Sequence, residues 1–395
     1  MMYQRALVRQ IKDRLAEDRG FIQIVVGPRQ TGKTTALRQA LEHATAPVHY
    51  ASADDPLLVT QSWLSNEWDQ ARQLYQTTGK TVILAIDEVQ KIPDWSAVVK
   101  MLWDEDAWHQ REIKVVLTGS SSLLIRKGLS ESLMGRFELL YCPHWSLTEC
   151  RAAFNYALED FLLFGGYPGS ARIKDDETRW LRYMSESIVE PTITQDVLMM
   201  QEIRKPALLR ALFLLGASHS GQELSYTKIL GQLHDAGNTT TIAHYLDLLG
   251  KAGMLCGLEK FAGDQIQMKK SSPRMLAFDT SLMVYAEGGG RDRMLGIPEM
   301  RGHLIETAVG ACLLARAQEE GFDLYWWRDR GFEVDFVLRK GRRITALEVK
   351  SGKIKDTKGS DEFLQRYPDA LRLVVGSANY PVERFLEGDV ELFLE

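Results

Sequence analysis

One short run of residues most constrains what this chain can fold into. It begins at Gly27, ends at Thr34, and matches the phosphate-loop pattern G-x-x-x-x-G-K-[ST] at every fixed position. An apolar run, 21–26, leads into it, and a segment with helical character, 35–41, follows it. In this strand–loop–helix context the glycines allow successive backbone N–H groups to turn toward phosphate oxygens. The sequence therefore predicts that the chain binds a nucleoside triphosphate.

A second motif follows the loop at the spacing of the same kind of site. An apolar run, 82–86, has the composition of a buried strand and ends in Asp87 and Glu88. At the carboxyl end of a strand beside a phosphate loop, Asp87 is expected to hold Mg²⁺ through water, and Glu88 to polarise the attacking water as a general base. Lys33 is then expected to reach the β- and γ-phosphates, with the Thr34 hydroxyl on the metal ion.

Two further positions are candidates for the same chemistry. The next strand ends in a hydroxyl-rich run, 118–122, whose Ser120 either contacts the γ-phosphate or belongs to a serine-rich turn. Arg136 precedes a further strand, and is either a surface residue or an arginine that stabilises the transferred phosphoryl group across a subunit interface. We keep both positions as candidates. The expected nucleotide contacts are Gly27, Pro28, Arg29, Gln30, Thr31, Gly32, Lys33, Thr34, Thr35, Asp87 and Ser120.

Composition narrows the class of protein. Of the 395 residues, 45% are apolar and 26% charged, as in ordinary globular proteins of about two or three domains. The net charge of −5 excludes a polycation that coats nucleic acid, so any nucleic-acid site must be a local patch. No apolar stretch reaches the roughly 18 residues of a membrane span, and residues 1–20 lack an apolar signal core. The cysteines lack metal-ligand spacing, which favours reduced thiols in a cytoplasmic protein: Cys142, Cys150, Cys256 and Cys312.

The order of the patterns predicts an α/β chain with several domains. Up to residue 145, apolar strands alternate with amphipathic helices, as in a parallel sheet with crossover helices. Residues 146–204 look helical and are expected to form a lid. Three short helices and a strand pair follow in the order of a winged helix-turn-helix, up to a glycine-rich loop at 288–290. The expected domains are 1–145, a P-loop ATPase core; 146–204, a helical lid; 205–290, a winged helix; and 291–395, a C-terminal α/β domain.

A second set of charged residues lies near the C-terminus. Two adjacent strand patterns carry Asp335, and Glu348 with Lys350, and strand alternation puts Glu348 and Lys350 on one face. Glu306 lies upstream in a helical segment. In metal-dependent hydrolysis, carboxylates hold Mg²⁺ against the scissile phosphate, and a lysine positions or activates the water. These residues resemble the core of the PD-(D/E)XK nucleases, and that resemblance implies a metal site made by Glu306, Asp335 and Glu348, with Lys350 as a catalytic residue.

Features that favour a nucleic-acid partner are modest. Between Arg339 and Lys358 the chain has eight basic residues against two acids, a net charge of +6, which either attracts phosphates or forms a solvated face. The aromatic run 325–327 either stacks on bases or, as we favour, packs in a core. The candidate recognition helix, 239–251, carries hydroxyls, His244 and Tyr245 but only one basic residue, so docking a protein is an equal alternative.

The motifs around the phosphate loop resemble a large group of bacterial and archaeal AAA-type ATPases of the AAA+ superfamily. In that group the ATPase module is joined to a C-terminal domain of unknown function. The resemblance rests on GPRQTGKTT, ILAIDEVQKIPDW, LTGSSS and SLMGR, and it covers essentially the whole chain. It implies Lys33, Thr34, Asp87 and Glu88 as nucleotide residues and Arg136 as the arginine finger.

The C-terminal order Glu…Asp…Glu-x-Lys resembles the core of the PD-(D/E)XK nucleases, which have a restriction-endonuclease-like α/β fold. Three interpretations of this segment stay open. It is an active metal-dependent nuclease, a nuclease-like fold used only for binding or regulation, or a charged hairpin with no site.

Together these features predict a cytoplasmic ATPase that uses ATP and Mg²⁺ and acts on DNA through its C-terminal domains. Nuclease activity is left open, and branched and single-stranded DNA are among the candidate forms. A homo-oligomer is expected, with a ring as one arrangement, and no membrane association. The alternative is a nucleotide-controlled switch that binds a protein partner and carries a catalytically inactive nuclease-like domain.

Overall fold

The computed structural model describes residues 3–54, 60–119, 133–197, 203, 205–233, 237–262, 271–352 and 358–393. It divides into two compact units, Met1–Pro143 and His144–Glu395, and each is described by itself. The boundary at 143 lies close to the predicted end of the ATPase core. The further division of the second unit at 204 and 290 stays a prediction.

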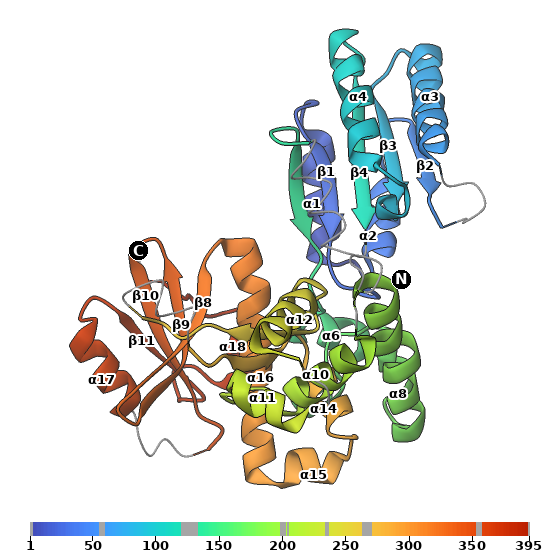
Figure 1. Cartoon of the computed structure of the whole chain (residues 1–395). Helices are drawn as coiled ribbons and strands as arrows, with labels where there is room; N and C mark the ends of the chain where they lie inside the picture. The colour runs from blue at the N-terminus through green and yellow to red at the C-terminus, as the bar shows by residue number, and fades with distance from the viewer. Residues whose placement is uncertain are drawn as a thin grey trace. The chain divides into compact units, whose positions relative to one another are not determined.

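The first unit is a parallel sheet covered by helices on both faces (Figure 1). Its five strands lie in the order β2-β3-β4-β1-β5, and all neighbouring strands are parallel. The predicted α/β class is thereby confirmed, and the two apolar runs expected to be strands, 21–26 and 82–86, form β1 and β3. The elements are α1 (Ala6–Ala16), β1 (Ile22–Val26), α2 (Lys33–Leu41), β2 (Val48–Ser52), α3 (Gln61–Thr78), β3 (Val82–Asp87), α4 (Trp95–Trp108), β4 (Ile113–Gly119) and β5 (Phe137–Tyr141).

The two faces of this sheet have separate apolar cores. Strands β1 and β3 are buried along their whole length, as expected for parallel strands with helices on both faces. Alternate residues therefore contribute to different cores: Ile24 packs with α3 and α4, whereas Val25 packs with α1 and α2. This arrangement fixes the carboxyl ends of β1, β3 and β4 at one edge of the sheet.

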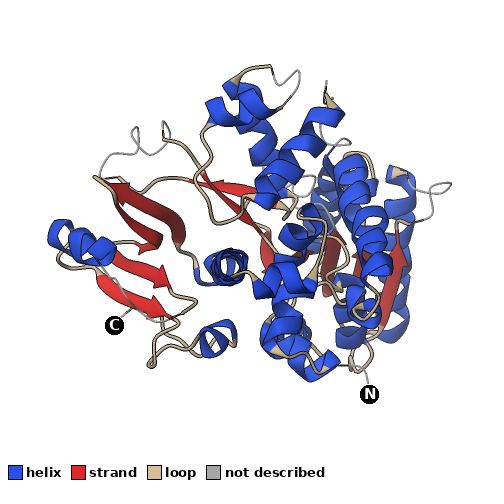
Figure 2. Ribbon diagram, turned by 90° about the horizontal axis from the view of Figure 1, so that it is seen from below, coloured by secondary structure: helices blue, strands red, loops and turns tan. Residues whose placement is uncertain are grey.

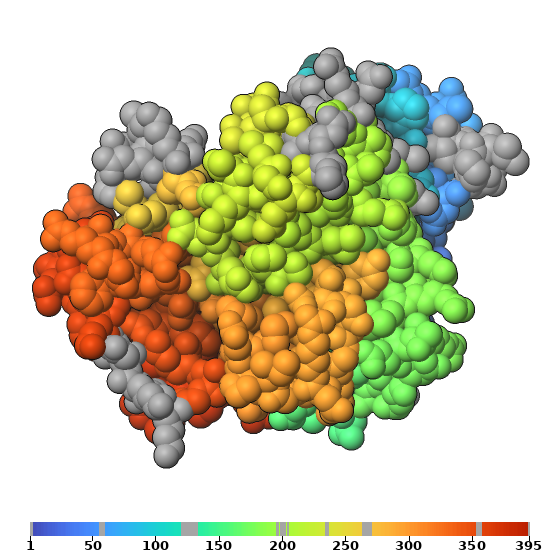
Figure 3. All heavy atoms as spheres, turned by 60° about the horizontal axis from the view of Figure 1, so that its bottom comes forward, coloured from blue at the N-terminus to red at the C-terminus, as the bar shows by residue number. Residues whose placement is uncertain are grey.

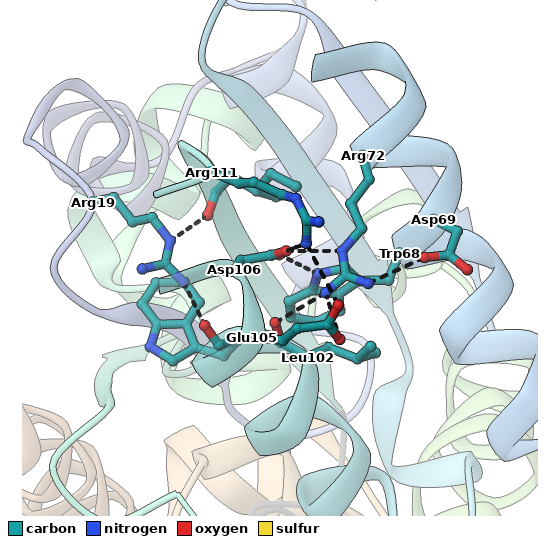
Figure 4. A network of polar contacts seen from close by, with 10 residues as sticks. Arg19, Trp68, Asp69, Arg72, Leu102, Glu105, Asp106 and Arg111 are labelled. Atoms are coloured by element: carbon teal, nitrogen blue, oxygen red, sulfur yellow. Dashed lines mark hydrogen bonds and ion pairs between the residues drawn. The ribbon is translucent and has the colours of Figure 1, made fainter. Parts of the chain in front are cut away.

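A buried polar network connects α3, α4 and the start of β4 (Figure 4). The Asp106 carboxylate is fully buried and accepts hydrogen bonds from Trp68 Nε1 at 2.6 Å, Arg72 Nε at 2.8 Å and Arg111 Nη1 at 3.0 Å. Arg72 also pairs with Asp69 at 3.2 Å, on the exposed side of α3. A buried carboxylate is tolerated here because several donors, two of them charged, surround it.

The second unit begins with helices and ends with a mixed sheet (Figure 2). Its N-terminal helices are α6 (Leu147–Phe154), α7 (Leu158–Phe164) and α8 (Glu177–Tyr183), with π-helical segments at Met184–Val189 and Thr192–Val197. The middle part comprises α10 (Pro206–Ser218), α11 (Tyr226–Gln232), α12 (Thr239–Lys251), and the antiparallel pair β6 (Leu255–Leu258) and β7 (Arg274–Ala277). The last part comprises α14 (Thr280–Ala286), α15 (Arg291–Gly296), α16 (Pro298–Glu320), β8 (Asp323–Asp329), β9 (Phe332–Lys340), β10 (Arg343–Val349), α17 (Lys358–Arg366), β11 (Leu371–Val375) and α18 (Val382–Leu386).

The sheet of the second unit has the order β11-β10-β9-β8. Strands β8, β9 and β10 are antiparallel neighbours, whereas β10 and β11 are parallel. Helix α17 covers one face, where Phe363 packs on Val337 and Trp327. Helix α16 lies on the other face, where a side chain at Gly310 would meet Phe336 at 2.8 Å. The aromatic run 325–327 is buried, so its role in core packing is confirmed.

The middle and last parts of the second unit are in direct contact, as the yellow-green and orange surfaces in Figure 3 illustrate. The backbone N–H of Phe261 donates to Trp326 O at 2.6 Å, and Trp326 N–H donates to Glu259 O at 3.2 Å. The chain after β6 is therefore hydrogen-bonded to β8. Over the described ranges, the helices are all too short or too polar to cross a bilayer.

Candidate functional site

The phosphate loop joins β1 to α2, and close backbone packing shapes it. A Cβ atom at Gly27 would lie 2.1 Å from Cys142 O, so only glycine fits beside the end of β5. Gln30 and Gly32 have positive φ angles of 58° and 94°. The left-handed Gly32 is the N-cap of α2 and lets the chain turn directly into the helix. The predicted contacts Pro28, Arg29, Thr34 and Thr35 lie in this loop or in the first turn of α2.

The Lys33 ammonium lies inside the loop. It is buried at the start of α2, and its Nζ donates to Gly27 O at 2.9 Å and to Pro28 O at 2.6 Å. The backbone thereby holds the cation at the N-terminus of a helix, where the aligned peptide dipoles also favour an anion. The loop therefore has the positive charge and the backbone shape that bind phosphate groups.

A buried arginine that no sequence motif marks supports the loop from behind. Arg5 lies just before α1, and its Nη1 donates to Thr31 O at 3.0 Å and to Pro143 O at 3.1 Å. The Thr31 hydroxyl is itself turned inward and donates to Pro28 O at 3.0 Å. Arg5 and Thr31 thus act on the loop through its backbone, and no motif marked Arg5.

Asp87 and Glu88 lie where predicted, at the carboxyl end of β3. The Asp87 carboxylate is buried, and it accepts hydrogen bonds from the Thr118 hydroxyl on one side and the Tyr50 hydroxyl, at 3.1 Å, on the other. Burial and the nearby Asp87 raise the pKa of Tyr50, so this phenol stays a donor. Gln90 Nε2 donates to Glu88 Oε2 at 2.6 Å. Both acidic side chains are therefore positioned by neighbours rather than left to rotate.

The hydroxyl that the structure brings to the acids is Thr118, at the end of β4. Its Oγ1 also lies 3.4 Å from the Glu88 backbone N–H, which donates to it. Strand β4 lies between β1 and β3, so Thr118 lies at the same edge of the sheet as the loop and the acids. The predicted Ser120 falls outside the described residues. The hydroxyl-rich run was the signal, but the pattern did not single out its first member.

Arg136 lies at the opposite edge of the sheet from the phosphate loop. It directly precedes β5, which runs parallel to β1, and its carbonyl accepts a hydrogen bond from Ile22 N–H at 2.8 Å. Five strand residues separate this edge from Gly27, which is about 17 Å of extended chain. The guanidinium is paired with the Asp104 carboxylate of α4, at 2.7 and 3.0 Å. Within one chain, then, Arg136 cannot reach the phosphates.

In the second unit, Glu306 and Asp335 come together, as predicted, but on an arginine. Arg274 of β7 pairs through Nη2 with Glu306, and with Asp335 Oδ1 at 3.5 Å. Its Nη1 pairs with Glu333 at 2.8 Å. Burial raises the pKa of Glu306, and the nearby positive charge of Arg274 opposes that shift. Neither Arg274 nor Glu333 was predicted to belong to this cluster. No sequence spacing links Arg274 to strand β9, which carries Glu333 and Asp335.

Glu348 and Lys350 interact mainly with each other. Glu348 is buried, and its carboxylate pairs with Lys350 Nζ at 2.9 Å and accepts the backbone N–H of Ser360 at 2.8 Å. Asp335 Oδ2 accepts the Val349 N–H at 2.7 Å. The expected metal ligands therefore already have protein partners.

The two units differ in whether their acidic residues are arranged to bind a divalent cation. Mg²⁺ in a nucleotide site usually takes one or two protein oxygens, several waters and the phosphates, and Thr34 with Asp87 fits that set. In the second unit the carboxylates do not fit a metal ion as they are arranged. Within the described ranges, no three acidic, histidine or cysteine side chains are grouped in a way that holds a metal ion.

Three family models match consecutive parts of the chain. An AAA domain matches residues 19–151, a domain of unknown function (DUF8612) matches 155–293, and another (DUF4143) matches 301–389. The first match and the parallel sheet with its phosphate loop agree that the N-terminal unit is similar to AAA-type P-loop ATPase domains. The two other models carry no stated function.

Whole-chain relatives extend over both units. The uncharacterized protein Rv2008c of Mycobacterium tuberculosis is 27% identical over 353 residues, 85% of this chain and 72% of the relative. The uncharacterized protein MJ1544 of Methanocaldococcus jannaschii is 22% identical over 337 residues, 80% of this chain and 72% of that one. Among solved structures, the Walker-type ATPase PABY2304 of Pyrococcus abyssi aligns with a TM-score of 0.49 and 15% identity, over 73% of this chain and 96% of that chain.

Proposed function

We propose that this protein is a Mg²⁺-dependent ATPase that couples ATP binding and hydrolysis to an action on DNA. The observation that carries the ATPase part is the shared sheet edge, where the loop with its buried Lys33 lies beside the acids Asp87 and Glu88. These groups have the charges and positions that phosphoryl transfer to water requires.

Each residue has a distinct role in this mechanism. The loop N–H groups and Lys33 bind the β- and γ-phosphates, and Thr34 and Asp87 supply oxygens for Mg²⁺, which neutralises charge on the phosphates when bound. Glu88 accepts a proton from the attacking water, and Gln90 orients its carboxylate. The Thr118 hydroxyl is hydrogen-bonded to both the Asp87 carboxylate and the Glu88 backbone N–H, and so fixes the positions of the two acids relative to each other.

We further propose that Arg136 completes the site of a second copy of the chain. The arginine lies at the far edge of its own sheet, and the surface around it is unusually apolar. Among the described residues, five large hydrophobic side chains are exposed, and four of them lie near Arg136 in the fold. Met134 is two residues before Arg136, and Phe21 precedes Ile22, whose N–H donates to the Arg136 carbonyl. Met101 and Trp108 lie within about one helical turn of Asp104, the ion-pair partner of Arg136. Trp108 is 85% exposed and Met134 is 76% exposed. Exposed apolar side chains around Arg136 favour a subunit interface at this place. The four side chains are Phe21, Met101, Trp108 and Met134.

Mixing two inactive variants tests this assignment. Lys33→Ala lacks the phosphate-binding cation, and Arg136→Ala lacks the finger, so each alone is expected to be nearly inactive. In an equal mixture, about a quarter of interfaces pair an intact loop with an intact Arg136, and turnover should recover to roughly that share. The measurement is ATP hydrolysis after mixing, with mixed assembly checked by crosslinking. Mixed oligomers without recovery would show that Arg136 has a structural role.

Support for the DNA part comes from the second unit. The turn between β9 and β10 carries Lys340, Arg342 and Arg343, and phosphates attract such a cluster. On α12, Thr239, Thr240 and His244 are exposed. Tyr245 is buried, so its side chain is not available for contacts with DNA. The α12 base, Lys251, pairs with Asp247 at 2.7 Å. We assign α10–α12 with β6 and β7 as a winged helix that contacts mainly the phosphate backbone of DNA.

One observation favours the alternative function, a nucleotide-controlled switch with an inactive nuclease-like domain. The Asp335 and Glu306 carboxylates are paired with Arg274, where a nuclease would hold a metal ion. DNA binding and protein docking differ in their salt dependence. Binding of a labelled DNA that weakens steeply with salt supports the first proposal, and an absence of DNA binding at low salt supports the switch.

A further inference from the structure

The carboxylate cluster of the second unit is built around Arg274. Each of its three guanidinium nitrogens has a partner: Nε donates to Gly221 O at 2.7 Å, Nη1 pairs with Glu333, and Nη2 pairs with Glu306 and Asp335. The side chain is 6% exposed. A guanidinium buried to this extent is stable only when nearby anions replace its water, and three carboxylates do so here.

The backbone around Arg274 is shaped to receive it. Gly221 has a φ angle of 82°, a conformation that other residues rarely adopt, and this turn directs its carbonyl to Arg274 Nε. A Cβ at Gly221 would also lie 3.3 Å from the Glu306 carboxylate. The glycine therefore allows both the arginine and the acid to occupy their positions, and the arrangement is a specific cradle rather than a surface ion pair.

The same carboxylates are those that the nuclease resemblance assigns to a divalent cation. Mg²⁺ and Mn²⁺ require carboxylate oxygens at about 2.1 Å. The Arg274 guanidinium is paired with both acids, Asp335 Oδ1 and Glu306, so a positive charge already lies where the metal ion would bind. A cation can enter between Glu306 and Asp335 only if the guanidinium leaves.

We infer that Arg274 is a built-in counter-cation that occupies the position of the divalent metal ion and excludes it from the Glu306–Asp335 cluster. The inference rests on the proposal that this unit is nuclease-like and inactive as it stands, and it states how its site is regulated. With Arg274 in place, the unit binds DNA but does not cleave it. Withdrawal of Arg274 converts the cluster into a site for Mg²⁺ or Mn²⁺.

Access does not explain the exclusion, because the cluster opens to solvent. A hollow of about 460 Å³ is lined by Arg274, Glu306 and Glu333, together with residues of the α10–α11 loop, α11, α16 and β8. Small cations can therefore reach the Glu306 and Glu333 carboxylates from this side. The remaining polar lining comes from Gln222, Glu223, Ser225, Lys228, His303 and Arg328.

Mn²⁺ binding to the full chain, measured by calorimetry without nucleotide, tests the inference. Arg274→Met removes the charge and keeps much of the aliphatic volume, and it should bind Mn²⁺ at least about tenfold more tightly than the parent chain. Adding Asp335→Asn should remove that gain. Arg328→Met is the matched control: Arg328 pairs with Glu333 at 3.3 Å and with Glu223, so its loss should leave Mn²⁺ binding unchanged.

Thermal melting with and without Mn²⁺ guards against a variant that folds poorly. The parent melting temperature should not respond to Mn²⁺, whereas Arg274→Met should melt lower and recover when Mn²⁺ replaces the lost charge. Three results overturn the inference: a parent chain that Mn²⁺ stabilises through Asp335, a folded Arg274→Met that gains no Mn²⁺ binding, or an unfolded one that Mn²⁺ does not restore. ATP hydrolysis on the same samples keeps the proposed ATPase activity a separate question.

Discussion

Glu88→Gln is expected to slow ATP hydrolysis by about a thousandfold and to leave ATP binding nearly unchanged. The amide keeps the size of the side chain but cannot take a proton from water, and general-base catalysis contributes roughly 10²–10⁴-fold. Binding should be retained because Lys33, the loop and Asp87, the groups that would hold the phosphates and the metal ion, are unchanged. Turnover and titration with a fluorescent ATP analogue measure the two effects separately.

Glu42→Gln is the matched control for this variant. Glu42 makes the same chemical change possible at an exposed position, the C-cap of α2, away from the acids. It should hydrolyse ATP like the parent. If Glu88→Gln also turns over at the parental rate, another group removes the proton and the assignment of Glu88 is wrong.

Asp106→Ala is expected to lower the free energy of unfolding of the N-terminal unit by about 3–5 kcal/mol. The substitution leaves Arg72, Arg111 and the Trp68 N–H without their shared buried acceptor, and removing one partner of a buried ion pair strands the others. Denaturant unfolding followed by tryptophan fluorescence measures the change. The transition that ATP shifts to higher denaturant belongs to this unit.

Asp69→Ala tests whether burial is the reason for that loss. Asp69 also pairs with Arg72, but its side chain is 59% exposed, so its removal should cost less than about 1 kcal/mol. Equal effects of the two substitutions would mean that the buried network of Figure 4 does not stabilise the unit more than a surface ion pair does.

The parts of the site that the sequence predicted are local. The phosphate loop is one uninterrupted run, and Asp87 and Glu88 end a strand whose apolar pattern is evident by itself. Parallel strands then bring such ends to one edge without any further information. The alternation of strands and helices likewise predicted the parallel sheet of the first unit. The grouping of Glu306 with Asp335 was instead implied by the resemblance of the C-terminal motif to a nuclease core.

The parts that the sequence did not predict depend on contacts between distant positions. Arg5 supports the loop from 26 residues away in sequence, at Thr31. Arg274 meets Glu306 across 32 residues and Glu333 across 59. A lone arginine in an apolar strand carries no motif, so only the fold shows that it neutralises the carboxylates that spacing alone assigned to a metal ion.

ATP turnover by the purified chain, with Mg²⁺ and with or without DNA, tests the central claim most directly. The account predicts turnover that Lys33→Ala abolishes, and an increase of several-fold with DNA that declines as salt is raised, because phosphate contacts weaken with salt. Turnover that DNA does not alter would favour the switch that binds a protein partner. Turnover no higher than that of Lys33→Ala, with the protein folded, would contradict the account.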